Sequence, residues 1–134
     1  MADGFLLPAT SAMTGALLIL LVFLSVRVTA RRAALGHIQF GDAGDEELRH
    51  RIRAHGNFIE IAPMMVLAIA LMEITDAPAA LLWAFAAIFI LGRVLHAIRF
   101  HLRNPYIGFF SIVSQHVICL SAGAWLLYRF TAVT

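Results

Sequence analysis

Four long apolar runs, separated by short polar stretches, dominate the pattern of positions along the chain. They cover residues 8–28, 52–74, 77–98 and 106–130. A helix needs about 20 apolar residues to cross a bilayer, and each run is that long. The pattern therefore predicts an all-α fold: one integral membrane domain over residues 1–134, built as a four-helix bundle.

Capping signals at the ends of the runs predict where the helices begin. Asp45 is a suitable N-cap, with Glu46 and Glu47 in the first turn, where carboxylates favour the positive end of the helix dipole. Asn104 and Pro105 repeat the signal, because proline is well tolerated at the first helical position. The predicted helices cover about residues 8–30, 46–75, 77–101 and 105–130.

Composition supports a membrane protein. Of the 134 residues, 61% are hydrophobic and only 13% are charged, against about 25% in a soluble domain. The first run is preceded by Asp3 in place of basic residues, and it is longer than the apolar region of a signal peptide, so we expect a retained helix. The single cysteine, Cys119, excludes an intrachain disulfide. The six histidines show no pair at metal-ligand spacing with a carboxylate between them, as in a His-Glu-x-x-His zinc site, so we expect no metal.

Arginines explain the basic pI of about 9.3, and they cluster at two of the three predicted loops. Those beside the first and third loops are Arg27, Arg31, Arg32, Arg49, Arg51, Arg53, Arg99 and Arg103. The second loop has only Glu73 and Asp76. The positive-inside rule therefore predicts cytoplasmic first and third loops and both termini outside. Because topology explains these charges, we expect no nucleic-acid partner.

A polar stripe runs along the second predicted helix. Arg49, Arg53, Asn57 and Glu60 fall within about 80° of one another, whereas Arg51 is expected on the outside of the helix or toward the loop. A charge near the bilayer centre costs roughly 2.5 to 3.5 kcal/mol, so Glu60 requires a partner. The stripe is either a ligand site or a salt-bridged seam between helices.

The third predicted helix carries a second stripe. Arg93, His96, Phe100 and Arg103 also lie within about 80°, with Arg99 at the edge. His96 fits either a hydrogen-bonded core residue or an acid–base group. Arg99 and Arg103 either belong to a site or extend their side chains to the membrane boundary.

Arg93 is the deepest cation, and Glu60 is its most economical partner, because charges buried in lipid pair with one another. We expect an ion pair of Glu60 with Arg93 or with Arg53, within one subunit or between two. Together the stripes predict a cationic, water-accessible cleft at the cytoplasmic end. It suits an anion that also carries an amino group, while its lipid-facing side admits an apolar co-substrate.

Two motifs in these stripes resemble those of the MAPEG family, the membrane-associated proteins of eicosanoid and glutathione metabolism. Arg53 to Glu60 resembles the family's Arg-x-x-x-Asn-x-x-Glu signature on helix two. The segment from Gly92 to His96 is similar to a family segment on helix three. The resemblance covers nearly the whole chain and implies a homotrimer of four-helix subunits.

The resemblance also implies that glutathione, as co-substrate, binds between adjacent subunits near the cytoplasmic face. Arg53, Asn57 and Glu60 are then its contacts. Arg93 and His96 line the same pocket. Arg49 shares the stripe on helix two and completes the expected binding set.

The chain departs from the family at the residues expected to stabilise the thiolate. Phe100 stands where several members have a tyrosine, and Tyr106 begins the segment where the helix-four arginine is expected. Arg103 or Arg99 are candidate replacements, because a nearby guanidinium favours the charged thiolate. Tyr106 is a candidate hydrogen-bond donor. These departures resemble the divergent bacterial members, so we expect a multi-pass protein of a bacterial inner membrane.

The expected function is therefore a glutathione-dependent membrane transferase or peroxidase. Its second substrate is a hydrophobic electrophile or a lipid hydroperoxide that arrives from the bilayer. The alternative is a noncatalytic protein with the same fold, which binds another small anion or a lipid.

Overall fold

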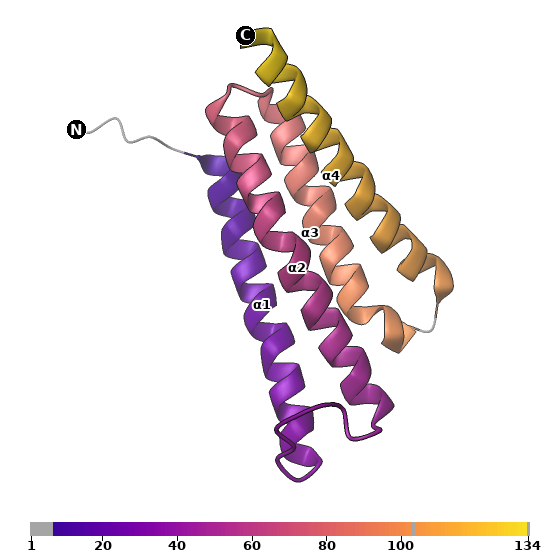
Figure 1. Cartoon of the computed structure of the whole chain (residues 1–134). Helices are drawn as coiled ribbons and strands as arrows, with labels where there is room; N and C mark the ends of the chain where they lie inside the picture. The colour runs from indigo at the N-terminus through magenta and orange to yellow at the C-terminus, as the bar shows by residue number, and fades with distance from the viewer. Residues whose placement is uncertain (1–6, 103, 134) are drawn as a thin grey trace, which may run out of the picture.

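A computed structural model describes residues 7–102 and 104–133, and for residues 100–102 and 133 it describes the backbone alone. Four helices follow one another along the chain (Figure 1): α1 Pro8–Ala34, α2 Glu46–Ile74, α3 Ala79–Leu102 and α4 Pro105–Val133. All four are long and apolar enough to cross a membrane. The predicted all-α membrane fold is confirmed, with helix bounds within four residues of expectation.

Consecutive helices run antiparallel (Figure 1). The α1–α2 loop lies at the same end as the end of α3 and the start of α4, and the α2–α3 turn lies at the opposite end. Within the described residues α1 and α4 do not contact each other, so α2 and α3 lie between them. Much of the apolar surface of α1 and α4 is exposed, as suits helices that face lipid.

The two predicted N-caps, Asp45 and Asn104, are confirmed, whereas α3 begins at Ala79 and not at the predicted residue 77. An oxygen of Asp45 accepts a hydrogen bond from the amide of Leu48 at 2.7 Å. Asn104 accepts from the amide of Tyr106 at 2.9 Å, and Pro105 is the first residue of α4. Both caps use local contacts to satisfy amides that a helix start leaves without a partner.

The end of the bundle at the α2–α3 turn is held by two long-range contacts. Glu73 accepts from the amides of Ala9 and Thr10 at 2.9 Å each, and from the Thr10 hydroxyl at 2.7 Å. Its carboxylate therefore lies at the positive end of α1. Arg129, near the end of α4, donates to the carbonyl of Thr75 at 2.9 Å.

The interior is apolar toward the α2–α3 turn and includes polar groups nearer the other end, which the charges predict to be cytoplasmic. Met13, Met65, Ile69 and Met72 are fully buried. Among the side chains that the structure describes, four polar ones are also buried: Arg93, His96, Ser111 and Gln115. The structure thus positions a polar group inside a membrane-length bundle.

Candidate functional site

Arg93 is the largest fully buried side chain, with only 2% of its surface exposed. Its Nη1 donates to Oδ1 of Asn57 on α2 at 2.6 Å, and its Nη2 donates to the carbonyl of Ser111 on α4 at 3.3 Å. Its guanidinium carbon lies 5.5 Å from the ring centre of Phe89. A buried charge is tolerated only with such partners, so Arg93 links three helices.

The ion pair expected within one subunit is not formed. Across the residues that the structure describes, Arg93 donates to Asn57, and neither Arg93 nor Arg53 pairs with Glu60. Glu60 lies about 60° around the helix from Asn57, since the two are three residues apart. Arg53 and Glu60 are both exposed on the outer side of α2. A pair between two subunits stays a prediction.

His96 is buried beside Ser111, which matches the expectation of a core histidine in polar contact. Its Nδ1 lies 3.5 Å from the Ser111 hydroxyl oxygen. That hydroxyl donates to the carbonyl of Gly108 at 2.8 Å. Since the hydroxyl proton points to Gly108, the contact is satisfied when His96 carries its proton on Nδ1.

Gly92 allows the close approach of α3 and α4 that creates this cluster. A Cβ at this position would lie 2.9 Å from the Ser114 hydroxyl oxygen and 3.6 Å from the Ser111 carbonyl. A Cβ here requires the Ser114 hydroxyl to turn away, whereas the Ser111 carbonyl would remain at ordinary contact distance. The glycine next to Arg93 therefore leaves room for the Ser114 hydroxyl beside the cluster.

Ser111 and Gln115 are the polar residues of the buried cluster that the sequence interpretation missed. Gln115 is only 5% exposed, and its Oε1 has no hydrogen-bond partner within the described part of the chain. The available signal was their four-residue spacing in an apolar run. Together with Ala122 and Ile118 they form the buried side of α4.

The other predicted residues lie apart from this cluster. Arg49 pairs with Asp42 in the α1–α2 loop at 2.5 Å. Tyr106 is 79% exposed. Arg99 is half-buried against α4, with its Cδ 3.6 Å from where a Cβ of Gly108 would lie. Arg103 and the side chain of Phe100 are outside the described residues.

A cleft of about 990 Å³ opens at the end of the bundle where α2 and α4 begin. It is lined by Asp45, Glu46, Glu47, His50, Arg99, Asn104, Pro105, Gly108, Phe109 and Ile112. Arg99 is the one predicted site residue among them. The single chain therefore separates an acidic and apolar cleft from the buried Asn57–Arg93 cluster, instead of forming one cationic cleft from both stripes.

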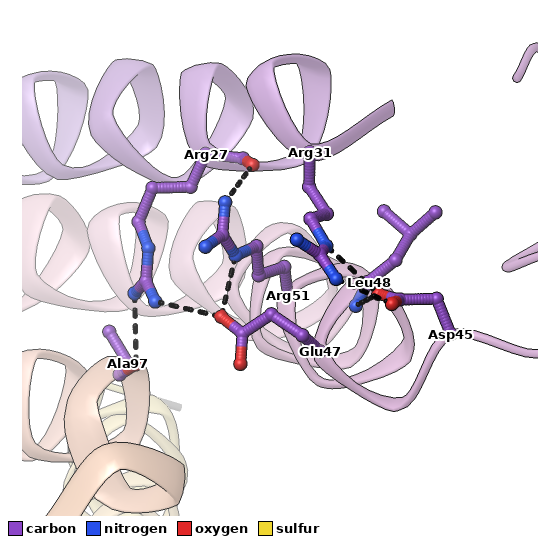
Figure 2. A network of polar contacts seen from close by, with 7 residues as sticks. All are labelled: Arg27, Arg31, Asp45, Glu47, Leu48, Arg51 and Ala97. Carbon is purple, nitrogen blue, oxygen red and sulfur yellow. Dashed lines mark hydrogen bonds and ion pairs between the residues drawn. The ribbon is translucent and has the colours of Figure 1, made fainter. Parts of the chain in front are cut away.

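Arginines of α1 and α2 neutralise part of the acidic side of the cleft (Figure 2). Arg31 holds Asp45 with two hydrogen bonds, of 3.1 and 2.6 Å. This contact, together with the amide of Leu48, lowers the pKa of the Asp45 carboxyl to about 2. Asp45 thus caps α2 and ties it to the end of α1.

Arg51 corrects another expectation, because it points inward (Figure 2). Its Nε donates to Glu47 at 2.7 Å, and its Nη1 donates to the carbonyl of Arg27 at 2.8 Å. Arg27 in turn donates to the carbonyl of Ala97 on α3 at 3.3 Å. This network joins α1, α2 and α3 beside the cleft.

Comparisons with known proteins agree with the fold and the motifs. The model of the MAPEG family matches residues 10–128. Over 66 residues the chain is 32% identical to the inner membrane protein YecN of Escherichia coli K12, and to the same protein of strain O6:H1. The match covers 49% of this chain and spans about half of each relative, 50% of its length. No solved structure matches. With four membrane-length helices and a family match over almost its whole length, the chain belongs to the MAPEG family.

Proposed function

We propose that this protein is a glutathione-dependent membrane transferase or peroxidase acting on a hydrophobic electrophile or a lipid hydroperoxide. The supporting observation is the 2.6 Å hydrogen bond from Arg93 to Asn57, which joins the two motifs on α3 and α2. Arg53 and Glu60 lie one helical turn before and after Asn57 and are exposed. Their guanidinium and carboxylate suit the carboxylates and ammonium of glutathione.

The exposed side of α2 supports a homotrimer as the working assembly. Glu60 lies fourteen residues from either end of the helix, too deep for a carboxylate that faces lipid. The exposed residues on this side are Arg53, Glu60, Met64, Leu67, Leu71 and Ile74. Arg53 lies seven residues before Glu60, and from Glu60 onward the spacing alternates between four and three residues, which is typical of a helix-packing seam. We propose that other subunits cover it and complete the glutathione site.

Thiolate stabilisation is assigned to residues near the start of α4. Arg99 reaches Gly108, within the segment where the family's helix-four arginine is expected. A guanidinium beside the thiol favours its ionised form. The thiolate sulfur then bonds to the electrophilic carbon as the leaving group departs with its bonding electron pair, or bonds to a hydroperoxide oxygen as the O–O bond breaks and the lipid alkoxide takes up a proton. Arg103 and Tyr106 are the other candidates for this role.

We place the protein in a bacterial inner membrane with both termini outside the cytoplasm. The α1–α2 loop and the start of α4 lie at one end of the bundle (Figure 1), and most arginines cluster there. The positive-inside rule assigns that end to the cytoplasm. The name of the Escherichia coli relatives, an inner membrane protein, supports the same location.

A noncatalytic role is the second candidate. Phe100 stands where several family members have a tyrosine, and the described start of α4 has no arginine, so two of the thiolate contacts implied by the family are altered. Tyr106, a candidate replacement, is 79% exposed. This chemistry favours a protein that binds a small anion or a lipid without turnover.

Calorimetric titration of the purified protein with glutathione tests the site. We expect Arg53→Ala and Glu60→Ala to abolish binding, and Asp76→Asn, an exposed control at the opposite end, to leave it unchanged. Glutathione affinity that survives both substitutions refutes the site. Turnover of a chlorinated aromatic electrophile then separates the two candidates, since binding without conjugation supports the noncatalytic role.

A further inference from the structure

The cleft between the starts of α2 and α4 has walls of opposite character. One wall comes from the first turns of α2, including Glu46 and His50. The other comes from α4 and includes Phe109 and Ile112, which are 69% and 39% exposed. Because both helices go on to cross the membrane, the cleft lies at the boundary between head groups and hydrocarbon.

The carboxylates of the polar wall differ in how closely they pair with cationic side chains. Asp45 is held by Arg31, and Glu47 is held by Arg51 at 2.7 Å. Glu46 lies 3.7 Å from the His50 ring nitrogen and attracts the Arg49 guanidinium through space, and its side chain is 83% exposed. Glu46 is thus the carboxylate that faces the cleft with an acceptor to offer.

The opposite charge comes from the base of the cleft. Arg99 lines it and extends along α4, with its Nη1 3.8 Å from the position of a Cβ at Gly108. Gly108 lies in the first turn of α4, where the helix dipole also favours an anion. One cleft therefore offers a cationic base and an anionic rim.

We propose that this cleft binds a zwitterionic phospholipid whose head group carries a phosphate and a primary ammonium. The phosphate lies against Arg99, and the ammonium donates to Glu46. An acyl chain leaves along Phe109 and Ile112 into the bilayer. A volume of about 990 Å³ accommodates a head group with the first part of its chains. The inference does not depend on glutathione binding.

Native mass spectrometry in detergent tests it, with equal amounts of short-chain phosphatidylethanolamine, phosphatidylglycerol and phosphatidylcholine as probes. We expect the ethanolamine lipid to bind best. A quaternary ammonium has no proton to donate to Glu46, and the glycerol head group has no cation. The preference should be about fivefold, as for one solvent-exposed ion pair.

Two substitutions separate the charges. Glu46→Gln should remove the preference while binding of the glycerol lipid persists, and Arg99→Gln should weaken all three lipids. Arg53→Ala, outside the cleft, is the control and should keep the preference even if it loses glutathione. If Glu46→Gln keeps the native preference for the ethanolamine lipid, the proposal is overturned. It is also overturned if Arg53→Ala loses that preference to the same extent as Glu46→Gln. Since Glu46 is exposed, Glu46→Gln is expected to fold. If Arg99→Gln fails to fold, the lipid preference of Glu46→Gln alone tests the proposal.

Discussion

Replacing Asn57 by alanine removes the side-chain acceptor of a buried guanidinium. In the native chain the Arg93 Nη1 donates to Asn57 Oδ1 at 2.6 Å, and Arg93 is 2% exposed. After the substitution that N–H has no acceptor on α2, and water has little access to it. We therefore expect Asn57→Ala to destabilise the fold through an unsatisfied charged group.

Two limits bound the loss of stability expected in Asn57→Ala. A hydrogen bond to a charged group contributes about 1.5 to 3 kcal/mol, whereas neutral side-chain pairs in membrane helices average about 0.6 kcal/mol. Because Arg93 is charged and keeps only the longer, 3.3 Å bond to Ser111, we expect a loss of about 2 kcal/mol.

A double-mutant cycle isolates this bond. Arg93→Met removes the charge while keeping an apolar chain of similar length, so Asn57→Ala should cost little in that background. Unfolding of the purified protein in mixed micelles, followed by circular dichroism, measures each variant. His116→Ala, an exposed change on α4, is the control. Additive effects of the two substitutions, with no coupling energy, refute the reasoning.

Three further predictions concern packing and charge. Gly92→Ala should destabilise by about 1 kcal/mol, because the new Cβ lies 2.9 Å from the Ser114 hydroxyl, which must turn away. Adding Ser114→Ala should restore part of the loss in the same unfolding assay. Glu73→Gln should weaken the start of α1, which amide hydrogen exchange there would report as faster exchange. The Asp45 pKa is lowered from 3.8 to about 2, so its contribution to stability is present above pH 3.8 and lost as the pH falls toward 2. The free energy of unfolding, measured as a function of pH below 3.8, should lose the part of its pH dependence that comes from this carboxyl in Asp45→Asn. If the pH dependence in Asp45→Asn is identical to that of the native chain, the role of Arg31 is contradicted.

The helices and their ends could be predicted because their causes are local. An apolar run of sufficient length forms a membrane helix wherever it occurs in the chain. The Asp45 and Asn104 caps bond to amides three and two residues away. Contacts at such short separation depend on neither the packing nor the order of the helices.

Which side chains contact each other across helices could be predicted less well. Periodicity placed Arg93 and His96 on one side of the third helix, yet the choice between Asn57 and Glu60 depends on a rotation of about 60°. Arg51 shows the same limit, because its inward contact with the Arg27 carbonyl depends on how α1 lies against α2.

The sequence by itself determined a four-helix membrane protein with charges gathered at one end, and it identified the residues that carry the family motifs. Only the tertiary structure decided that Asn57 holds the buried arginine, that Glu60 remains exposed on α2, and that Arg99 borders a separate cleft. The physical reason is that side-chain partnership in a bundle depends on axial register and rotation. Packing at the helix interfaces sets both, and a pattern along one helix does not record it.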